Sequence, residues 1–255
     1  MRPSVLFVSH GSPTLVLDPI PAHAALRALG AALPVPAAVL VISAHWETTA
    51  PTVDAAPQPA TIHDFYGFPA DLYAQRYAAP GAPALARRAH ELLAAAGLDP
   101  APPAERGLDH GAWVPLALLR PAADVPVFQV SVVPDRDAAW HRRLGAALAP
   151  LRDEGVMIVG SGAVTHTLRA IDWRRRGGPG LPWVEDFADA VAARVTAGET
   201  LDDWLTLPHA AANHPSPEHF LPLPAAQGAA GGAAATLVHR STDFAALRMD
   251  VYRWE

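Results

Sequence analysis

Short apolar runs rich in β-branched residues constrain the fold of this chain more than any other feature. Four of these runs lack alternation between apolar and polar positions, which is typical of strands buried on both faces of a parallel sheet. The four runs are Val5–Val8, Ala38–Ser43, Val127–Val132 and Val156–Val159. Further strands are predicted at Ala235–Val238 and Leu247–Tyr252.

Helical patterns separate these runs. Leu144, Leu148 and Leu151 recur at helical spacing before a natural stop at Gly155. Similar patterns are found at Ala84–Ala96, and at Phe187, Val191 and Val195 after Pro182. The alternation predicts an α/β fold of three layers, with an open, mostly parallel sheet and helices on both faces. We find no repeat or linker and expect a single domain over residues 1–255.

The remaining stretches are predicted to be irregular. They comprise two loops and a mobile Gly/Ala-rich turn, namely Pro51–Pro83, Arg174–Pro182 and Ala225–Ala235. The densest basic cluster, Arg174–Arg176, is interpreted as part of a solvated loop.

Composition excludes several classes of function. The formal net charge is -6 and no broad basic face is visible, which argues against nucleic-acid binding. No apolar run approaches the length of a membrane span, and the run at Val5–Val8 is too short for the apolar core of a signal peptide. We therefore expect a cytoplasmic protein with no membrane partner. The sequence leaves its oligomeric state open.

Histidines are the strongest candidates for the residues of a functional site. The chain has 12 His and no Cys, so any metal must be bound by histidine, carboxylate or water. Three predicted strands each lead into a histidine, at His10, His45 and His166. The carboxyl ends of parallel strands lie at one edge of the sheet, where ligands bind. The sequence therefore predicts that these three histidines share a site at that edge.

A fourth segment, Asn213–His219, could complete this site. His214, Glu218 and His219 compete for the role of third metal ligand beside His10 and His45, and spacing does not choose between them.

Two further histidines are candidates. His110 follows Asp109, which either orients its imidazole or caps a helix that begins there. His63 lies in an aromatic loop and faces either substrate or solvent.

Six motifs in a fixed order carry a family resemblance. They are Ser9–Pro13, Ser43–Trp46, Thr61–Phe65, Asp109–Gly111, Gly160–Gly162 with His166, and Pro217–His219. Together they resemble the class III extradiol ring-cleavage dioxygenases, and within them the 4,5-DOPA dioxygenase branch. The resemblance covers the chain from about Val5 to Leu223.

The resemblance implies an enzyme that opens a catechol-type ring beside its two hydroxyls, with O₂ and non-haem iron(II). Zinc(II) is the alternative metal in a purified sample. By the same resemblance, His10, His45 and His219 match metal ligands. His166 matches a catalytic acid/base or a further ligand, and His110 matches a catalytic residue near the ligands or the substrate.

Aromatic side chains could form a flat substrate pocket beside the metal. With His63, the candidates are Trp46, Phe65, Tyr66, Phe68 and Trp113, each of which could equally pack in the core.

Two other classes of function remain open: a zinc-dependent hydrolase or tetrapyrrole metal chelatase that uses the same histidines, and a binding protein without catalysis.

Overall fold

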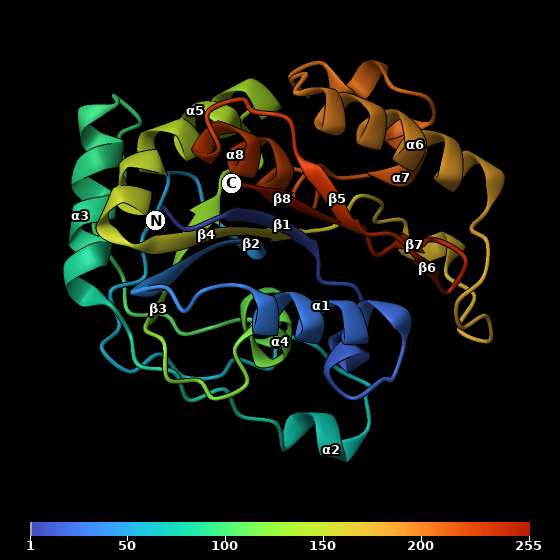
Figure 1. Cartoon of the computed structure of the whole chain (residues 1–255), viewed down its shortest axis with the longest axis horizontal. Helices are drawn as coiled ribbons and strands as arrows, with labels where there is room; N and C mark the ends of the chain where they lie inside the picture. The colour runs from blue at the N-terminus through green and yellow to red at the C-terminus, as the bar shows by residue number, and fades with distance from the viewer. Residues whose placement is uncertain (1) are drawn as a thin grey trace.

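The computed structural model describes residues 2–255, and its centre is a six-stranded sheet in the order β3-β2-β4-β1-β8-β5 (Figure 1). The strands β1, β2, β3 and β4 are mutually parallel, whereas β8 runs antiparallel to β1 and β5. Their bounds are β1 Val5–Ser9, β2 Ala38–Glu47, β3 Val127–Val132, β4 Val156–Gly162, β5 Thr236–His239 and β8 Val251–Trp254. A separate hairpin pairs β6 Thr242–Asp243 with β7 Leu247–Arg248.

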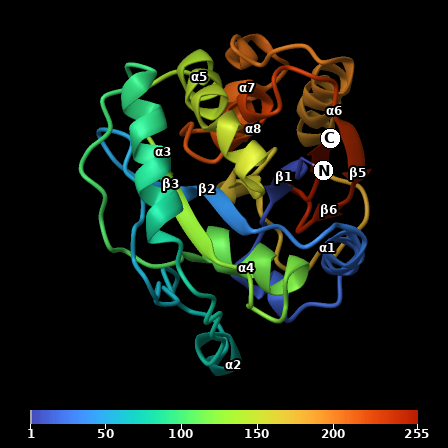
Figure 2. The ribbon, with the colours of Figure 1, turned by 60° about the vertical axis from the view of Figure 1, so that its left-hand side comes forward.

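Helices cover both faces of the sheet (Figures 1 and 2). One apolar core joins the sheet to α1 and α4, and a second core on the opposite face joins it to α3, α5, α6 and α8. The α-helices are α1 Pro21–Ala32, α2 Ala70–Tyr73, α3 Pro83–Ala95, α4 His110–Leu119, α5 Ala138–Leu148, α6 Pro182–Ala197, α7 Ala210–Asn213 and α8 Pro222–Ala229. Short 3₁₀ helices are η1 Pro13–Val16, η2 Ala149–Glu154, η3 Leu168–Ala170 and η4 Trp204–Thr206.

This arrangement confirms the predicted three-layer α/β fold. The single strand predicted at Leu247–Tyr252 is wrong, because β7 ends at Arg248 and β8 begins only at Val251. The predicted loop Pro51–Pro83 also contains one short helix, α2. No helix within residues 2–255 is long and apolar enough to span a membrane.

The mobile turn predicted over Ala225–Ala235 is wrong in its first half. Ala225–Ala229 belongs to α8, a helix that is buried along its whole length. Its small residues let two backbones approach each other. A Cβ at Gly145 of α5 would lie 1.7 Å from the Ala225 carbonyl oxygen, and one at Gly228 would lie 1.8 Å from that of Arg142. The Ala/Gly composition therefore produces close helix packing.

The same close packing positions the turn that precedes α8. A Cβ at Gly162, the last residue of β4, would lie 2.2 Å from the His219 carbonyl oxygen. The backbone N–H of Ala163 donates to that oxygen at 2.8 Å. On the other side of β4, the His10 backbone N–H donates to the Gly162 carbonyl at 3.0 Å. The end of β4 thus fixes two distant segments that each carry a histidine.

Candidate active site

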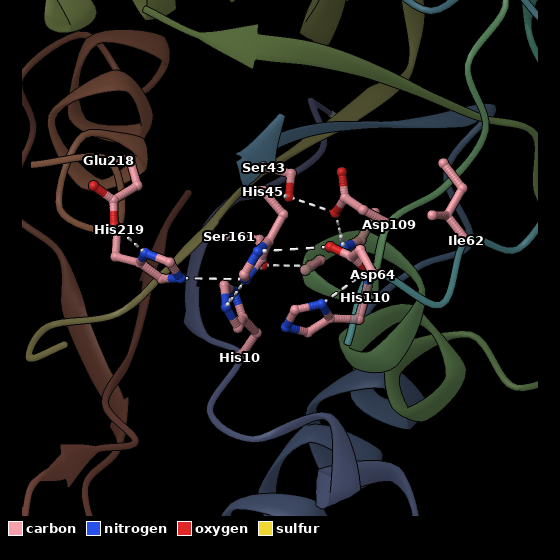
Figure 3. Close-up of polar contacts among 12 residues, drawn as sticks. His10, Ser43, His45, Ile62, Asp64, Asp109, His110, Ser161, Glu218 and His219 are labelled. Carbon is pink, nitrogen blue, oxygen red and sulfur yellow. Dashed lines mark hydrogen bonds and ion pairs between the residues drawn. The ribbon is translucent and has the colours of Figure 1, made fainter. Parts of the chain in front are cut away.

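Four histidines from separate parts of the chain meet at the carboxyl edge of the parallel strands (Figure 3). His10 directly follows β1, His45 lies near the end of β2, and His110 is the first residue of α4. His219 lies in the turn before α8. β1 and β2 both pair in parallel with β4, so their carboxyl ends share this edge. The predicted meeting of His10 and His45 is confirmed.

The ring nitrogens of three of these histidines face one another. The Nε2 atom of His45 lies 3.0 Å from Nε2 of His10 and 3.2 Å from Nε2 of His219. Groups behind each ring decide which nitrogen carries the proton. The Ser161 hydroxyl donates to the Gly111 carbonyl at 2.5 Å, so it accepts from His10 Nδ1, 3.0 Å away. His10 Nε2 therefore holds a free lone pair.

A carboxylate fixes the same tautomer in His219. Glu218 Oε1 lies 2.8 Å from His219 Nδ1, and an ionised carboxylate can only accept. Asp64 Oδ2 lies 3.6 Å from His45 Nδ1 and likewise favours a proton on that nitrogen, which leaves His45 Nε2 with a free lone pair. Three lone pairs thus converge, which is unfavourable without a cation. The chemistry of this donor set fits one divalent metal ion held by three imidazoles.

Possible ligand atoms form two separate groups, and within each group they lie within 4.8 Å of one another. One group is His10 with His45 and His110, and the other is His166 with Glu218 and His219. The facing Nε2 atoms join the two groups through His219. Glu218 uses Oε1 on the Nδ1 side of that ring. The geometry therefore favours His219 over Glu218 as third ligand. His214, the other alternative, instead pairs through Nε2 with the Val164 carbonyl at 2.8 Å.

Burial lowers the pKa values of four imidazoles at the site, those of His10, His45, His166 and His219. Burial, followed by repulsion from neighbouring histidines, holds the pKa values of His10 and His219 well below the usual 6.5. Burial is also the main cause that lowers the pKa of His45 to about 3 and that of His166 to about 4. Neutral imidazoles can coordinate a metal near pH 7 without first losing a proton.

His110 is oriented by Asp64. Asp64 Oδ1 accepts from the His110 backbone N–H and lies 2.9 Å from its Nδ1. Burial of Asp64 opposes its ionisation, yet these contacts outweigh it and lower the pKa of the carboxyl to about 2. The ionised Asp64 therefore holds a proton on His110 Nδ1 and leaves Nε2 free to accept.

Asp109 has a separate structural role beside His110. It caps α4 by accepting from the Ala112 backbone N–H at 3.1 Å, and it also binds Ser43 and Arg106. The helix-cap alternative for Asp109 is therefore confirmed. His110 nevertheless remains at the site, since the first turn of α4 points toward the other histidines (Figure 3).

His166 approaches the cluster from the loop after β4. Its ring stacks on His219 with centroids 3.4 Å apart, and its Nδ1 lies 3.8 Å from Glu218 Oε1. The His166 backbone N–H donates to the Asn213 carbonyl at 2.9 Å, which anchors the loop. The structure therefore places His166 beside His219, and His166 lines the same cavity as His10 and His45, as the strand-end pattern predicted.

A cavity of about 350 Å³ opens above the histidines. Its walls are largely apolar and are formed by Pro13, Phe65, Tyr66, Phe68, Leu168, Ile171, Trp173 and Leu247. Tyr66 is 92% exposed and Trp173 is 58% exposed, so both lie at the mouth. The cavity suits a flat aromatic ring with polar substituents directed at the histidines.

The predicted aromatic wall is only partly correct. Phe65 lines the cavity, but Trp46 does not. Neighbouring residues of a strand point to opposite faces, so His45 and Trp46 cannot share one cavity. Trp46 instead packs under the Arg106 guanidinium, 5.2 Å from its ring centroid.

His63 and Trp113 support the wall from behind. The His63 ring packs edge-on against Phe65 with centroids 5.6 Å apart, and its Nε2 pairs with the Gln75 carbonyl at 3.1 Å. Trp113 is buried and donates from Nε1 to the Ile62 carbonyl at 2.9 Å. Neither residue lines the cavity. Sequence reasoning missed Asp64 and Ser161, although both lie inside motifs that it singled out.

Comparison with known proteins decides the family. Residues 5–248 match the family described as the catalytic LigB subunit of aromatic ring-opening dioxygenase. The chain belongs to this family. It is an extradiol aromatic ring-opening dioxygenase of a metal-dependent family, which confirms the resemblance and supports it over the hydrolase, chelatase and non-catalytic alternatives.

Relatives of this dioxygenase cover nearly its whole length. A Beta vulgaris protein named 4,5-DOPA dioxygenase extradiol is 43% identical and covers 97% of this chain and 95% of its own. A protein of that name from Escherichia coli K12 is also 43% identical, and the match covers 87% of this chain and 83% of that protein. The crystal structure of an uncharacterised Escherichia coli K12 protein superposes over 100% of both chains with a TM-score of 0.84 and 35% identity.

Proposed function

We propose that this dioxygenase opens the ring of a DOPA-like catechol with O₂, using iron(II) held by His10, His45 and His219. The single observation that carries the proposal is the convergence of three Nε2 lone pairs at the floor of a largely apolar cavity. The name shared by the Beta vulgaris and Escherichia coli relatives supports the substrate class.

His166 is the proposed acid/base. A catechol must lose protons from its hydroxyls to become an electron-rich ligand, and a neutral imidazole can accept such a proton. The low pKa of His166, caused mainly by burial, keeps this ring uncharged before substrate binds. Protonated His166 would then lie 3.8 Å from the Glu218 carboxylate, which stabilises the charge.

His110 is the proposed partner of the second hydroxyl. Asp64 binds its Nδ1, so Nε2 is the nitrogen that can accept a hydrogen bond inside the cavity. Phe65 and Phe68 hold the ring and exclude water from the reacting edge. When bound, iron(II) supplies the redox chemistry that joins O₂ to the ring. The cytoplasmic location and the single domain over residues 1–255 stay predictions.

Metal identity gives a direct test of this proposal. We expect O₂ uptake with L-DOPA from protein loaded anaerobically with iron(II). The zinc(II)-loaded protein should show none, because zinc has no redox chemistry. An oxygen electrode and metal analysis of the same samples measure both quantities. Full activity in a verified iron-free, zinc-loaded sample would contradict the iron assignment, and inactivity of both forms would contradict the proposed reaction.

A further inference from the structure

A second hollow adjoins the mouth of the catechol cavity. It encloses about 410 Å³ and shares three lining residues with that cavity, Tyr66, Phe68 and Trp173. Its chemistry differs. The described lining of the first cavity contains no carboxylate, lysine or arginine, whereas the second hollow contains Asp18 and Arg176. One continuous surface therefore leads from the histidines over three aromatic rings to a pair of opposite charges.

Arg176 is held in place from several sides. Its Nη2 lies 2.7 Å from Asp18 Oδ2, and its Nε lies 3.6 Å from Asp243 Oδ1. Its guanidinium carbon lies 4.3 Å from the centroid of the Phe244 ring. This packing distinguishes Arg176 from its neighbour Arg174, whose side chain is 90% exposed and pairs only locally with Asp172. Arg176 lies in an exposed loop, as predicted for the arginine cluster, but unlike Arg174 it also forms ion pairs with residues remote in the chain.

The pair remains accessible to a ligand. The side chain of Arg176 is 38% exposed and that of Asp18 is 29% exposed. Asp243, by contrast, is 7% exposed and serves as a buried anchor for the guanidinium. Anchoring by Asp243 and Phe244 lets Arg176 keep its position when a ligand takes over part of its contact with Asp18. Such preorganisation reduces the entropy lost on binding.

The position of the pair matches the far end of a substituted catechol. A catechol whose hydroxyls faced the histidines would direct a side chain on the opposite part of its ring toward the mouth, where the two hollows share Tyr66, Phe68 and Trp173. An α-amino acid ends in a carboxylate and an ammonium group. Guanidinium binds carboxylate with charge-assisted hydrogen bonds, and a carboxylate binds ammonium in the same way.

We propose that Arg176 and Asp18 select catechols that carry an α-amino-acid side chain, with Arg176 binding the carboxylate and Asp18 the ammonium group. This inference rests on the proposed ring-opening function and adds the residues that set its substrate specificity.

Four catechols and two substitutions test the assignment on the iron(II)-loaded protein. The substrates are L-DOPA, dopamine, 3,4-dihydroxyphenylpropionate and 4-methylcatechol, and kcat/KM for each is compared with that for 4-methylcatechol. Arg176→Met should lower this ratio at least about 10-fold for L-DOPA and for the propionate, the two carboxylates, but not for dopamine. Asp18→Asn should lower it for L-DOPA and dopamine, the two amines. The control Arg174→Met, in the same loop, should keep the wild-type ratios.

Failure of the specificity assignment and failure of the proposed ring-opening function give different results. If both variants change all four substrates by the same factor, the two residues are structural and the inference is overturned. It is also overturned if wild-type protein shows no preference for L-DOPA over 4-methylcatechol. If wild-type protein opens none of the four catechols, the proposed function itself is refuted and the specificity assignment falls with it.

Discussion

Replacing His10 by alanine is expected to lower iron(II) affinity by more than about 100-fold and to abolish O₂ uptake. Loss of a residue that merely orients a ligand typically costs 10–100-fold in metal affinity, and loss of a ligand costs more. The substitution removes one of three converging Nε2 atoms, and the remaining pair, His45 and His219, leaves an incomplete coordination shell. Isothermal titration under anaerobic conditions measures the affinity.

His90→Ala provides the matched control, because His90 lies on α3, a helix that packs on the sheet away from the site. This variant should bind iron like the wild type. Circular dichroism and thermal unfolding confirm that both variants fold. Iron bound at wild-type affinity by the His10 variant would contradict the ligand assignment.

Replacing His166 by glutamine should slow turnover at least about 100-fold while the protein retains iron. Glutamine keeps a polar side chain of similar reach but cannot accept a proton near neutral pH, and general acid–base groups typically contribute 10²–10⁴-fold. The stacking of His166 on His219 makes metal retention the necessary second readout. Single-turnover O₂ uptake and iron content are measured on the same sample.

Two results would change the role of His166. Loss of iron from the glutamine variant would make His166 a fourth ligand, and His110 would become the candidate base, since its Nε2 is free and it lines the cavity. Near wild-type turnover would show that His166 moves no proton in the rate-limiting step. The control is His209→Gln, because His209 is an exposed residue that directly precedes α7. It measures the effect of losing a histidine outside the site.

The sequence predicted the site well where strand topology decides position. His10 and His45 follow parallel strands, and parallel strands place their carboxyl ends together whatever the loops do. His219 could not be chosen over Glu218 or His214 in the same way. Its position depends on α8, whose close approach to β4 is made possible by Gly160 and Gly162.

Other features were missed for separate physical reasons. The Trp46 prediction ignored the two-residue period of a strand, a rule that the sequence itself could have supplied. Arg176 could not be distinguished from Arg174 by composition, since its contacts with Asp18 and Asp243 join residues remote in the chain. No pattern of neighbouring residues in a sequence indicates an ion pair between segments so far apart in the chain.

The central claim is that this chain opens a catechol ring outside the diol at its three-histidine metal site. The most direct measurement is the structure of the product that the iron(II)-loaded protein forms from 4-methylcatechol, which has no amine to condense with the new carbonyl groups, obtained by NMR and mass spectrometry with O₂ uptake recorded alongside. We predict one O₂ consumed per product, a mass increased by two oxygen atoms, and one new aldehyde with one new carboxylic acid. A product with two new carboxylic acids, or an unopened quinone, would contradict the claim.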